Sequence, residues 1–497
     1  MFKLLIVLCL VLITQIGLAQ SNQKDDSVRQ NYLAEQKKLG RSFADDFYPK
    51  FSAYYSLSEK DFLAKIESTR STFDALLKKY SSGFDPTFIE SQNIEIKYYF
   101  DKLILDYPSN HQTYTGKKVS LSSKTDKNLK RNSADFNKPE LLTNTDFTEY
   151  VRAFLSYQVD LEVKKSLYQN QDNQRLNAVW RIIPGLFTNQ KTLDFWKYDY
   201  LLNHIDNLGV KNIKSIYENF TAACQDLSYL SKVNQLYNAD WQGRRGHLTK
   251  TYKRVGKFDL DAHLFLPDGA SSGQKRPVIV FFHGGSWSEG KPDYFFEEAR
   301  RYARKGWVAA AIEYRLFARQ GTLPFAAVMD AKSAIRWLRK NADEFGIDAE
   351  KIVASGNSAG GHLVLATALA DKWNEKTDDL KFSSVPNALL VNAGVYDLTD
   401  KRNAWIRKDL KDKNLVKEIS PNHLIKKNLP PTLLIHGTAD RNVSYTTADT
   451  FKSAAEKIIN NVKLYPLDSA GHFIWFDPKF AKQVSKIRED FLSELGF

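Results

Sequence analysis

The spacing of hydrophobic and polar positions changes about halfway along the chain. Over residues 23–241, apolar side chains recur every three or four positions, as on the buried face of an amphipathic helix. A stretch at 108–144 is rich in Lys, Ser, Thr and Asn, which predicts a loop within this part. The pattern predicts an all-helical accessory domain over residues 23–241. One clear helical run consists of Phe147, Val151, Phe154, Leu155 and Val159.

From residue 246 onward, short runs rich in β-branched and aromatic residues alternate with helical patterns. This alternation is typical of βαβ units, so the sequence predicts an α/β domain over residues 246–497, with a mostly parallel sheet flanked by helices. The expected strands are 258–266, 277–282, 308–314, 352–355, 388–393, 432–436 and 462–465. The expected helices are 295–305, 325–345, 361–373 and 447–459.

The first residues, 1–19, have the pattern of a signal peptide. A basic residue, Lys3, precedes an apolar run at 4–13, and Gly17 and Ala19 supply the small residues of a cleavage site. The run is about half the ~20 residues that span a bilayer, so we expect cleavage rather than membrane anchoring. The sequence therefore predicts a periplasmic or secreted protein without stable membrane insertion. Cys9 would leave with the signal and Cys224 would remain, a buried thiol with no intramolecular disulfide.

The formal net charge is +13, and the Lys and Arg residues are spread along the whole chain. This distribution favours a dispersed basic surface over a dedicated site for an acidic partner. No nucleic-acid-binding motif is present, so no nucleic-acid partner is expected. The sequence has no His-Glu-x-x-His motif, no cysteine cluster and no glycine-rich nucleotide loop after a strand. We therefore predict neither a metal nor a cofactor.

A candidate nucleophile lies in the sequence Gly-Asn-Ser-Ala-Gly-Gly at residues 356–361. It follows the apolar run 352–355 and opens a helical pattern, which is the strand–turn–helix context of a Gly-x-Ser-x-Gly nucleophile elbow. The serine of such an elbow sits in a strained turn, where a side chain at either flanking glycine would clash. The sequence therefore predicts Ser358 as the nucleophile, at the N-terminus of a helix whose dipole favours developing negative charge.

A second glycine-containing loop follows the expected strand 277–282. It reads His-Gly-Gly-Ser-Trp at residues 283–287, and such a loop lets backbone N–H groups approach an oxyanion. The expected donors are the amides of Gly285 and Ser286, with that of Ala359 after the nucleophile. His283 precedes the nucleophile in sequence, so we expect it to orient this loop rather than act as a base.

The expected acid and base follow later strands. Asp440 lies just past the strand 432–436, at the carboxyl edge of the sheet where active sites form. Asp397, after the preceding strand, is the alternative acid. His472 lies in a Gly-flanked loop after the last strand, and the order Ser358, Asp440, His472 is the one that α/β-hydrolases use.

These motifs resemble the acetyl esterase and hormone-sensitive-lipase-like branch of the α/β-hydrolases. One position departs from the usual His-Gly-Gly-Gly, since Ser286 replaces the third glycine. A backbone donor remains, so the resemblance still implies activity, but it does not fix the shape of the acyl pocket. The resemblance implies an α/β-hydrolase fold and carboxylesterase activity. The matching segments are His283-Gly284-Gly285-Ser286-Trp287, Tyr314-Arg315-Leu316, the run 330–338, Gly356-Asn357-Ser358-Ala359-Gly360-Gly361-His362, Asp440 and Gly471-His472.

The residues and the resemblance together predict an exported serine carboxylesterase. Exported members of this branch resemble acetylxylan and feruloyl esterases, which implies a small-molecule or glycan ester as substrate. Ser286 and Trp287 are expected to crowd the oxyanion loop and favour short acyl groups. The segment 401–431, with Trp405 and Ile406, is expected to shape the substrate mouth. The alternatives are a prolyl-oligopeptidase-type exopeptidase and a catalytically silent binding module.

Overall fold

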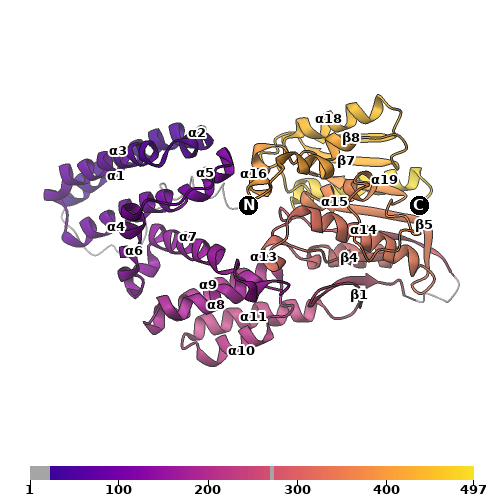
Figure 1. Ribbon diagram of the computed structural model, residues 1–497, viewed down its shortest axis with the longest axis horizontal. Helices are drawn as coiled ribbons and strands as arrows, with labels where there is room; N and C mark the ends of the chain where they lie inside the picture. Colours follow the sequence, from indigo (N-terminus) through magenta and orange to yellow (C-terminus); the bar gives the residue numbers. More distant parts are fainter. Residues whose placement is uncertain (1–22, 269–273) are drawn as a thin grey trace. The chain divides into compact units, whose positions relative to one another are not determined.

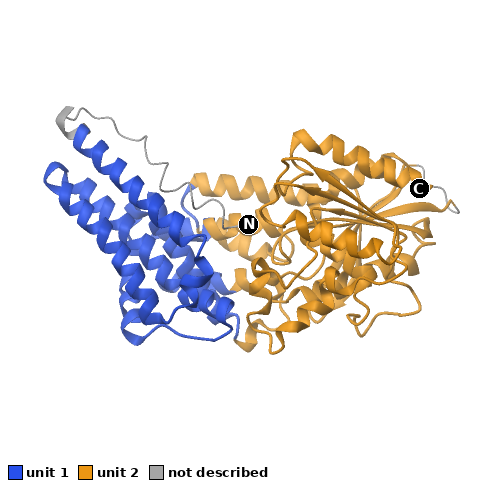
Figure 2. Cartoon of the chain, turned by 90° about the horizontal axis from the view of Figure 1, so that it is seen from above, with its two compact units in different colours: residues 1–164, 178–198, 224–226 blue, residues 165–177, 199–223, 227–497 orange. Residues whose placement is uncertain are grey.

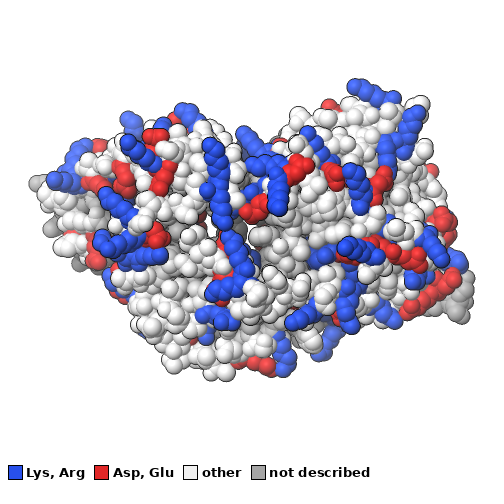
Figure 3. All heavy atoms as spheres, in the orientation of Figure 1, with Lys and Arg blue, Asp and Glu red and all other residues white. Residues whose placement is uncertain are grey.

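The computed structural model describes residues 23–268 and 274–497 (Figure 1). The predicted signal peptide at 1–19 lies outside the described residues. None of the helices in the described part of the chain is long and apolar enough to cross a membrane. On the face drawn in Figure 3, basic and acidic side chains are interspersed rather than gathered into one patch.

The chain forms two compact units (Figure 2). Unit 1 consists of residues 1–164, 178–198 and 224–226, and unit 2 consists of residues 165–177, 199–223 and 227–497. The expected boundary between 241 and 246 therefore lies inside unit 2, where helical segments precede the sheet.

Residues 23–243 are helical, as the periodicity predicts. Several helices begin at capping residues: the side chains of Ser58, Asp85 and Asn144 each accept an N–H of the first helical turn. The helices are α1 (Gln23–Phe47), α2 (Phe51–Ser56), α3 (Glu59–Tyr80), α4 (Pro86–Leu105), α5 (Tyr107–Thr115), α6 (Ser123–Lys130), α7 (Thr145–Glu162), α8 (Gln174–Leu186), α9 (Gln190–Leu208), α10 (Lys214–Ala223) and α11 (Leu227–Gly243).

The expectation of a loop at 108–144 is wrong. This segment holds most of α5, all of α6 and two short 3-10 helices, η3 (Arg131–Asp135) and η4 (Pro139–Thr143). Ser122 caps α6, since its hydroxyl accepts the Thr125 N–H. Polar residues at close intervals cap short helices here, and helices of this length show too few apolar positions for a periodic signal.

Unit 2 contains the expected mostly parallel sheet. Its eight strands have the order β1-β2-β4-β3-β5-β6-β7-β8. β2 pairs antiparallel with both β1 and β4, and the other neighbours are parallel. The strands are β1 (Leu248–Val255), β2 (Phe258–Phe265), β3 (Arg276–Phe282), β4 (Val308–Ile312), β5 (Ile347–Asn357), β6 (Ala388–Asn392), β7 (Thr432–Gly437) and β8 (Val462–Leu467).

The two faces of the sheet carry separate cores. Along β3, Val278 and Val280 pack with residues of α14, α15 and α18, while Ile279 and Phe281 pack with residues of α12 and α19. A strand buried on both faces reads as an unbroken apolar run, which is why β3 is so clear in the sequence. The helices that follow β3 along the chain are α12 (Phe296–Arg304), α13 (Phe317–Gln320), α14 (Pro324–Lys340), α15 (Ala359–Leu369), α16 (Ala404–Arg407), α17 (Pro421–Leu424), α18 (Tyr445–Glu456) and α19 (Pro478–Glu494).

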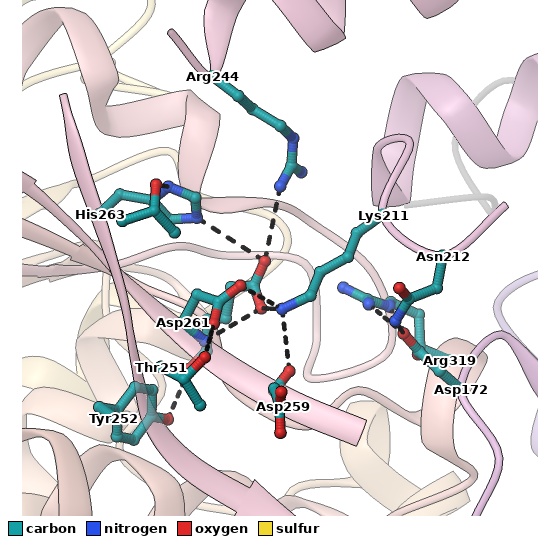
Figure 4. Close-up of polar contacts among 12 residues, drawn as sticks. Asp172, Lys211, Asn212, Arg244, Thr251, Tyr252, Asp259, Asp261, His263 and Arg319 are labelled. Atoms are coloured by element: carbon teal, nitrogen blue, oxygen red, sulfur yellow. Dashed lines mark hydrogen bonds and ion pairs between the residues drawn. The ribbon is translucent and has the colours of Figure 1, made fainter. Parts of the chain in front are cut away.

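Buried ion pairs bind the helical segments of unit 2 to its sheet (Figure 4). The Lys211 ammonium lies 2.5 Å from an Asp261 carboxylate oxygen and 2.6 Å from one of Glu313. Asp172 receives hydrogen bonds from Arg319 at 2.5 Å and from Gln320 at 2.9 Å. The segments that contain Asp172 and Lys211 thus supply counter-charges to the sheet region, and this explains why they belong to unit 2.

We predict that Lys211→Met destabilises unit 2 by about 3 kcal/mol, because it removes a cation from two largely buried carboxylates. A urea titration of the full chain measures this change. Lys214→Met is the matched control: this lysine is in the same helical segment, but its side chain is 77% exposed. Its unfolding midpoint should match that of the unsubstituted protein, and an equal loss in both variants would contradict the prediction.

Candidate functional site

The candidate nucleophile occupies a strained turn between β5 and α15. Ser358 has φ 55° and ψ −118°, a conformation that L-residues rarely adopt. A Cβ added to Gly356 would lie 2.5 Å from the Gly360 carbonyl, and one added to Gly360 would lie 1.9 Å from the Phe282 oxygen. Both flanking positions therefore require glycine, as a nucleophile elbow does. Ser358 itself is half-buried at the carboxyl end of the strand.

The second glycine-containing loop passes beside this serine. We call residues 283–290 the oxyanion loop. A Cβ added to Gly284 would lie 3.3 Å from the Ser358 Cβ. Among the described residues, the backbone N–H groups of Gly285, Ser286 and Ala359 donate no hydrogen bond to the protein. These three amides are thus available to an oxyanion formed at the serine.

His283 is fixed in the protein interior at the start of the oxyanion loop. Its ring stacks on Tyr314 with 4.3 Å between the ring centroids, and the Tyr314 hydroxyl donates to the His283 carbonyl at 2.7 Å. Burial lowers the pKa of His283 to about 4, so the ring is neutral at ordinary pH. These contacts suit a residue that orients the loop.

Trp287 does not crowd the entrance, contrary to expectation. Its side chain is 1% exposed in the core, and its Nε1–H donates to His362 Nδ1 at 3.2 Å. The other nitrogen of His362 donates to the Ile419 carbonyl at 2.7 Å. The positive φ of Trp287, 56°, turns its ring inward, while Ser286 stays exposed.

The candidate acid and base lie in contact. His472 Nδ1 is 2.7 Å from an Asp440 carboxylate oxygen, and both residues are 8% exposed. The other Asp440 oxygen accepts the N–H groups of Asn442 and Val443 at 2.8 and 2.9 Å. Burial alone would raise the pKa of Asp440, but hydrogen bonds from His436 and His472 outweigh it and hold that pKa well below its usual range.

Asp397 lies elsewhere. One of its carboxylate oxygens accepts both the N–H and the hydroxyl of Thr399, each at 2.7 Å. Its nearest histidine partner is His423, at 3.5 Å. This carboxylate closes a local turn, and the geometry favours Asp440 as the partner of His472.

Ser358 and His472 share no hydrogen bond within the part of the chain that the structure describes. A nucleophile and its base often lie further apart in a ligand-free protein than in a substrate complex. Each lies at a loop that follows a strand of the same sheet, β5 for the serine and β8 for the histidine.

Sequence reasoning missed two features around the acid–base pair. His436 Nε2 lies 3.2 Å from the same Asp440 oxygen that contacts His472. Its position four residues before the acid, at the end of β7, was the available signal. Three aromatic rings also follow His472, with Phe473 and Trp475 centred 5.2 and 5.6 Å from the imidazole and Phe476 next to Trp475.

The segment 401–431 forms short helices on the hydrolase-like sheet. Ile406 is fully buried in the core, so it does not line a mouth, while Trp405 is half-buried and contacts Phe317 edge-on. Cys224 is buried as expected, and burial raises its pKa to about 11.

Comparison with known proteins gives matches in the sheet-bearing part of the chain. Residues 262–455 match the BD-FAE family model. Esterase LipQ of Mycobacterium tuberculosis is 30% identical over 198 residues, which are 37% of this chain and 46% of that protein. Esterase LipC of the same organism is 30% identical over 214 residues, 39% of this chain and 52% of that protein.

The chain thus spans about half the length of the curated relatives it matches. Among solved structures, esterase 2 of Thermogutta terrifontis is 35% identical, with a TM-score of 0.48, and the match covers 51% of this chain and 94% of that one.

The strand order, the glycine-flanked turn at Ser358 and the sequence matches lead to one assignment. The sheet-bearing part of the chain has the α/β-hydrolase fold, and its sequence is similar to those of two proteins named esterases.

Proposed function

We propose that the protein is a serine carboxylesterase whose triad is Ser358, Asp440 and His472. The observation that carries this proposal is the 2.7 Å contact between Asp440 and His472, in the domain whose elbow bears Ser358. The esterase names of the relatives support the reaction class.

The roles follow from the geometry. His472 takes the proton from the Ser358 hydroxyl as its oxygen attacks the ester carbonyl carbon, and the carbonyl oxygen becomes an oxyanion. The amides of Gly285, Ser286 and Ala359 donate to that oxyanion. His472 then gives the proton to the departing alkoxide, and an acyl group remains on Ser358. Water, deprotonated by His472, hydrolyses this ester and restores the serine.

Asp440 supports His472 in both half-reactions. Its carboxylate holds the proton on Nδ1, so that Nε2 faces the serine, and it stabilises the imidazolium that forms. The low pKa of Asp440 keeps this charge present over the whole range in which an imidazole is neutral.

The proposed substrates are short-chain acyl esters of glycans, which the exported protein meets outside the cytoplasm. In the described segment 401–427 the large apolar side chains Ile406, Val416 and Ile419 are buried, so this segment offers no broad apolar surface of the kind a lipase uses. The alcohol part of the ester must lie next to His472, because this residue protonates it as it leaves. Exposed Phe473 and Phe476 there suit the flat face of a sugar ring. The signal-like pattern at 1–19 supports export.

The prolyl-oligopeptidase alternative calls for a β-propeller before the hydrolase domain. Residues 23–243 are helical instead, and the first described strand begins at Leu248. The binding-module alternative predicts that a covalent serine probe leaves the protein unlabelled.

We expect Ser358→Ala to abolish hydrolysis of 4-nitrophenyl acetate and labelling by a fluorophosphonate probe. The smaller side chain fits the turn, so circular dichroism and the unfolding midpoint should stay unchanged. Turnover close to that of the unsubstituted protein would refute Ser358 as the nucleophile and the proposed function with it.

Asp440→Asn should lower kcat by on the order of 10³- to 10⁴-fold, because an amide does not hold the required His472 tautomer. Asp397→Asn is the matched control, since it changes a neighbouring loop carboxylate whose bonds are to Thr399. Steady-state kinetics on one acetyl ester measure both variants. A larger loss in Asp397→Asn would mean that the acid has been misassigned.

A substrate panel tests acyl and alcohol preference separately. For 4-nitrophenyl esters, kcat/KM should fall from acetyl or butyryl to octanoyl and longer chains. For acetyl esters, acetylated xylo-oligosaccharides should give a higher kcat/KM than ethyl acetate, and Phe476→Ala should reduce that preference. A rise in kcat/KM from C2 to C12 would indicate a lipase, and equal values for both alcohols would remove the glycan assignment.

A further inference from the structure

The oxyanion loop is strained and depends on its surroundings for its shape. Gly285, Ser286 and Trp287 all have positive φ, at 118°, 53° and 56°. A positive φ at a residue other than glycine costs on the order of 1–3 kcal/mol, and the conformation persists only when neighbouring structure holds it. A Cβ added to Gly290 would lie 2.3 Å from the Gly284 carbonyl and 2.4 Å from His283 Nδ1. The end of the loop therefore packs directly on its beginning.

That end of the loop is bonded to the C-terminus of α9. The Gly290 N–H donates to the Asn207 carbonyl at 2.8 Å. The next residue, Lys291, reaches the Ile205 carbonyl at 3.3 Å and an Asp240 carboxylate oxygen at 2.6 Å. A lysine and a carboxylate at this distance form a directional tether when both are withdrawn from water, and the side chains are 15% and 2% exposed.

Asp240 is itself fixed on α11. Its second oxygen accepts the Val210 N–H and the Arg244 Nε–H, each at 3.2 Å. Burial would raise the pKa of Asp240, but Lys291 and Arg244 outweigh it and lower that pKa, so the carboxylate stays ionised. The helical region 199–243 is also joined to the sheet region through Lys211, whose ammonium contacts a carboxylate oxygen of Asp261 (Figure 4) and one of Glu313.

The middle of the loop is held from a second side. The carbonyls of Trp287 and Ser288 accept the N–H groups of Phe317 and Ala318, each at 3.0 Å. Phe317 and Ala318 open α13, which ends in Arg319 and Gln320, the two residues bonded to Asp172. Both supports of the loop therefore lead to segments that precede the sheet in the sequence.

We propose that the segment 199–243 positions the oxyanion loop, with Asp240 acting through Lys291 as a positioning residue for ester hydrolysis. This inference rests on the proposed function and adds to it a role for part of the helical half. Asp240 touches no reacting atom. Its effect is on where the Gly285 and Ser286 amides point when the oxyanion forms. A displacement of those donors weakens transition-state binding and leaves ground-state binding of the ester largely unchanged.

Lys291→Met in the full-length chain tests the proposal. Methionine keeps the packing of the lysine stem, and Asp240 retains its contact with Arg244, which also lies 3.7 Å from Asp293 and from Glu313. We expect kcat for 4-nitrophenyl acetate to fall ~10- to 100-fold, with KM changed less than about threefold. The Ki of a trifluoromethyl ketone should rise by the same factor as kcat/KM falls, because its adduct with Ser358 carries an oxyanion. Lys291→Arg, which keeps the ion pair, should restore most of the activity.

Lys253→Met is the matched control. Lys253 is also a buried lysine, 2.6 Å from the Asp330 carboxylate, and Asp330 likewise retains an arginine, Arg315. It lies on β1 and bonds Asp330 and Ser333 rather than any residue of the oxyanion loop. We expect a comparable loss of stability in urea, with kcat and the Ki of the ketone within about twofold of the unsubstituted values.

Two results would overturn the inference: Lys291→Met with kcat and Ki unchanged, or Lys253→Met with losses in both equal to those of Lys291→Met. If Lys291→Met does not fold, the double variant Asp240→Asn/Lys291→Met, which removes both charges together, takes its place under the same criteria. Ser358→Ala separates this outcome from failure of the proposed function. An active Ser358→Ala protein removes the esterase assignment, whereas an inactive one beside a fully active Lys291→Met protein removes only the role of Asp240.

Discussion

The organisation of unit 2 depends on one buried carboxylate, that of Glu313 just past the end of β4. The residue is 2% exposed, so its charge needs cations close by. Lys211 lies 2.6 Å away and Arg244 3.7 Å away, and both come from the helical segments before the sheet. Burial would raise the pKa of Glu313, yet the neighbouring His263 and the cations outweigh it and hold that pKa well below its usual range. A chain without these helical segments would take two cations, Lys211 and Arg244, away from this buried charge, and an under-compensated buried charge costs several kcal/mol.

The candidate site is built from two strained turns that fit against each other. Ser358 lies at the end of β5 and the oxyanion loop at the end of β3, and these strands are neighbours in the sheet. Gly360 packs on the Phe282 carbonyl so closely that no side chain fits between them. Neighbouring parallel strands therefore bring the candidate nucleophile and the candidate amide donors to one place. The strain in each turn is sustained by the packing of the other and by contacts from α9 and α13.

The sequence predicted the sheet, and it predicted which carboxylate lies beside His472. Buried strands are continuous apolar runs, and the motif order along the chain placed Asp440 rather than Asp397 beside His472. β1 was missed because it is a polar edge strand with exposed Thr and Arg positions. The expected boundary at 241–246 differs from the division into compact units, in which residues 199–223 and 227–243 belong with the sheet. Helical periodicity shows which face of a helix is buried, but it does not show which unit that face packs against. Trp287 was expected in the entrance, but its side chain lies in the core. The positive φ of this residue could not be foreseen from the sequence, because amino-acid composition does not reveal it.

Asp440 shows how the fold prepares the acid–base pair before a substrate arrives. Two backbone N–H groups fix one of its oxygens, and His436 and His472 share the other. Three hydrogen bonds and the nearby His436 therefore hold the carboxylate in one orientation. These contacts favour the ionised state and hold the pKa of Asp440 well below its usual range. In the mechanism we propose, an acid that is already oriented needs little rearrangement when His472 takes the proton from Ser358, and this lowers the barrier to that transfer.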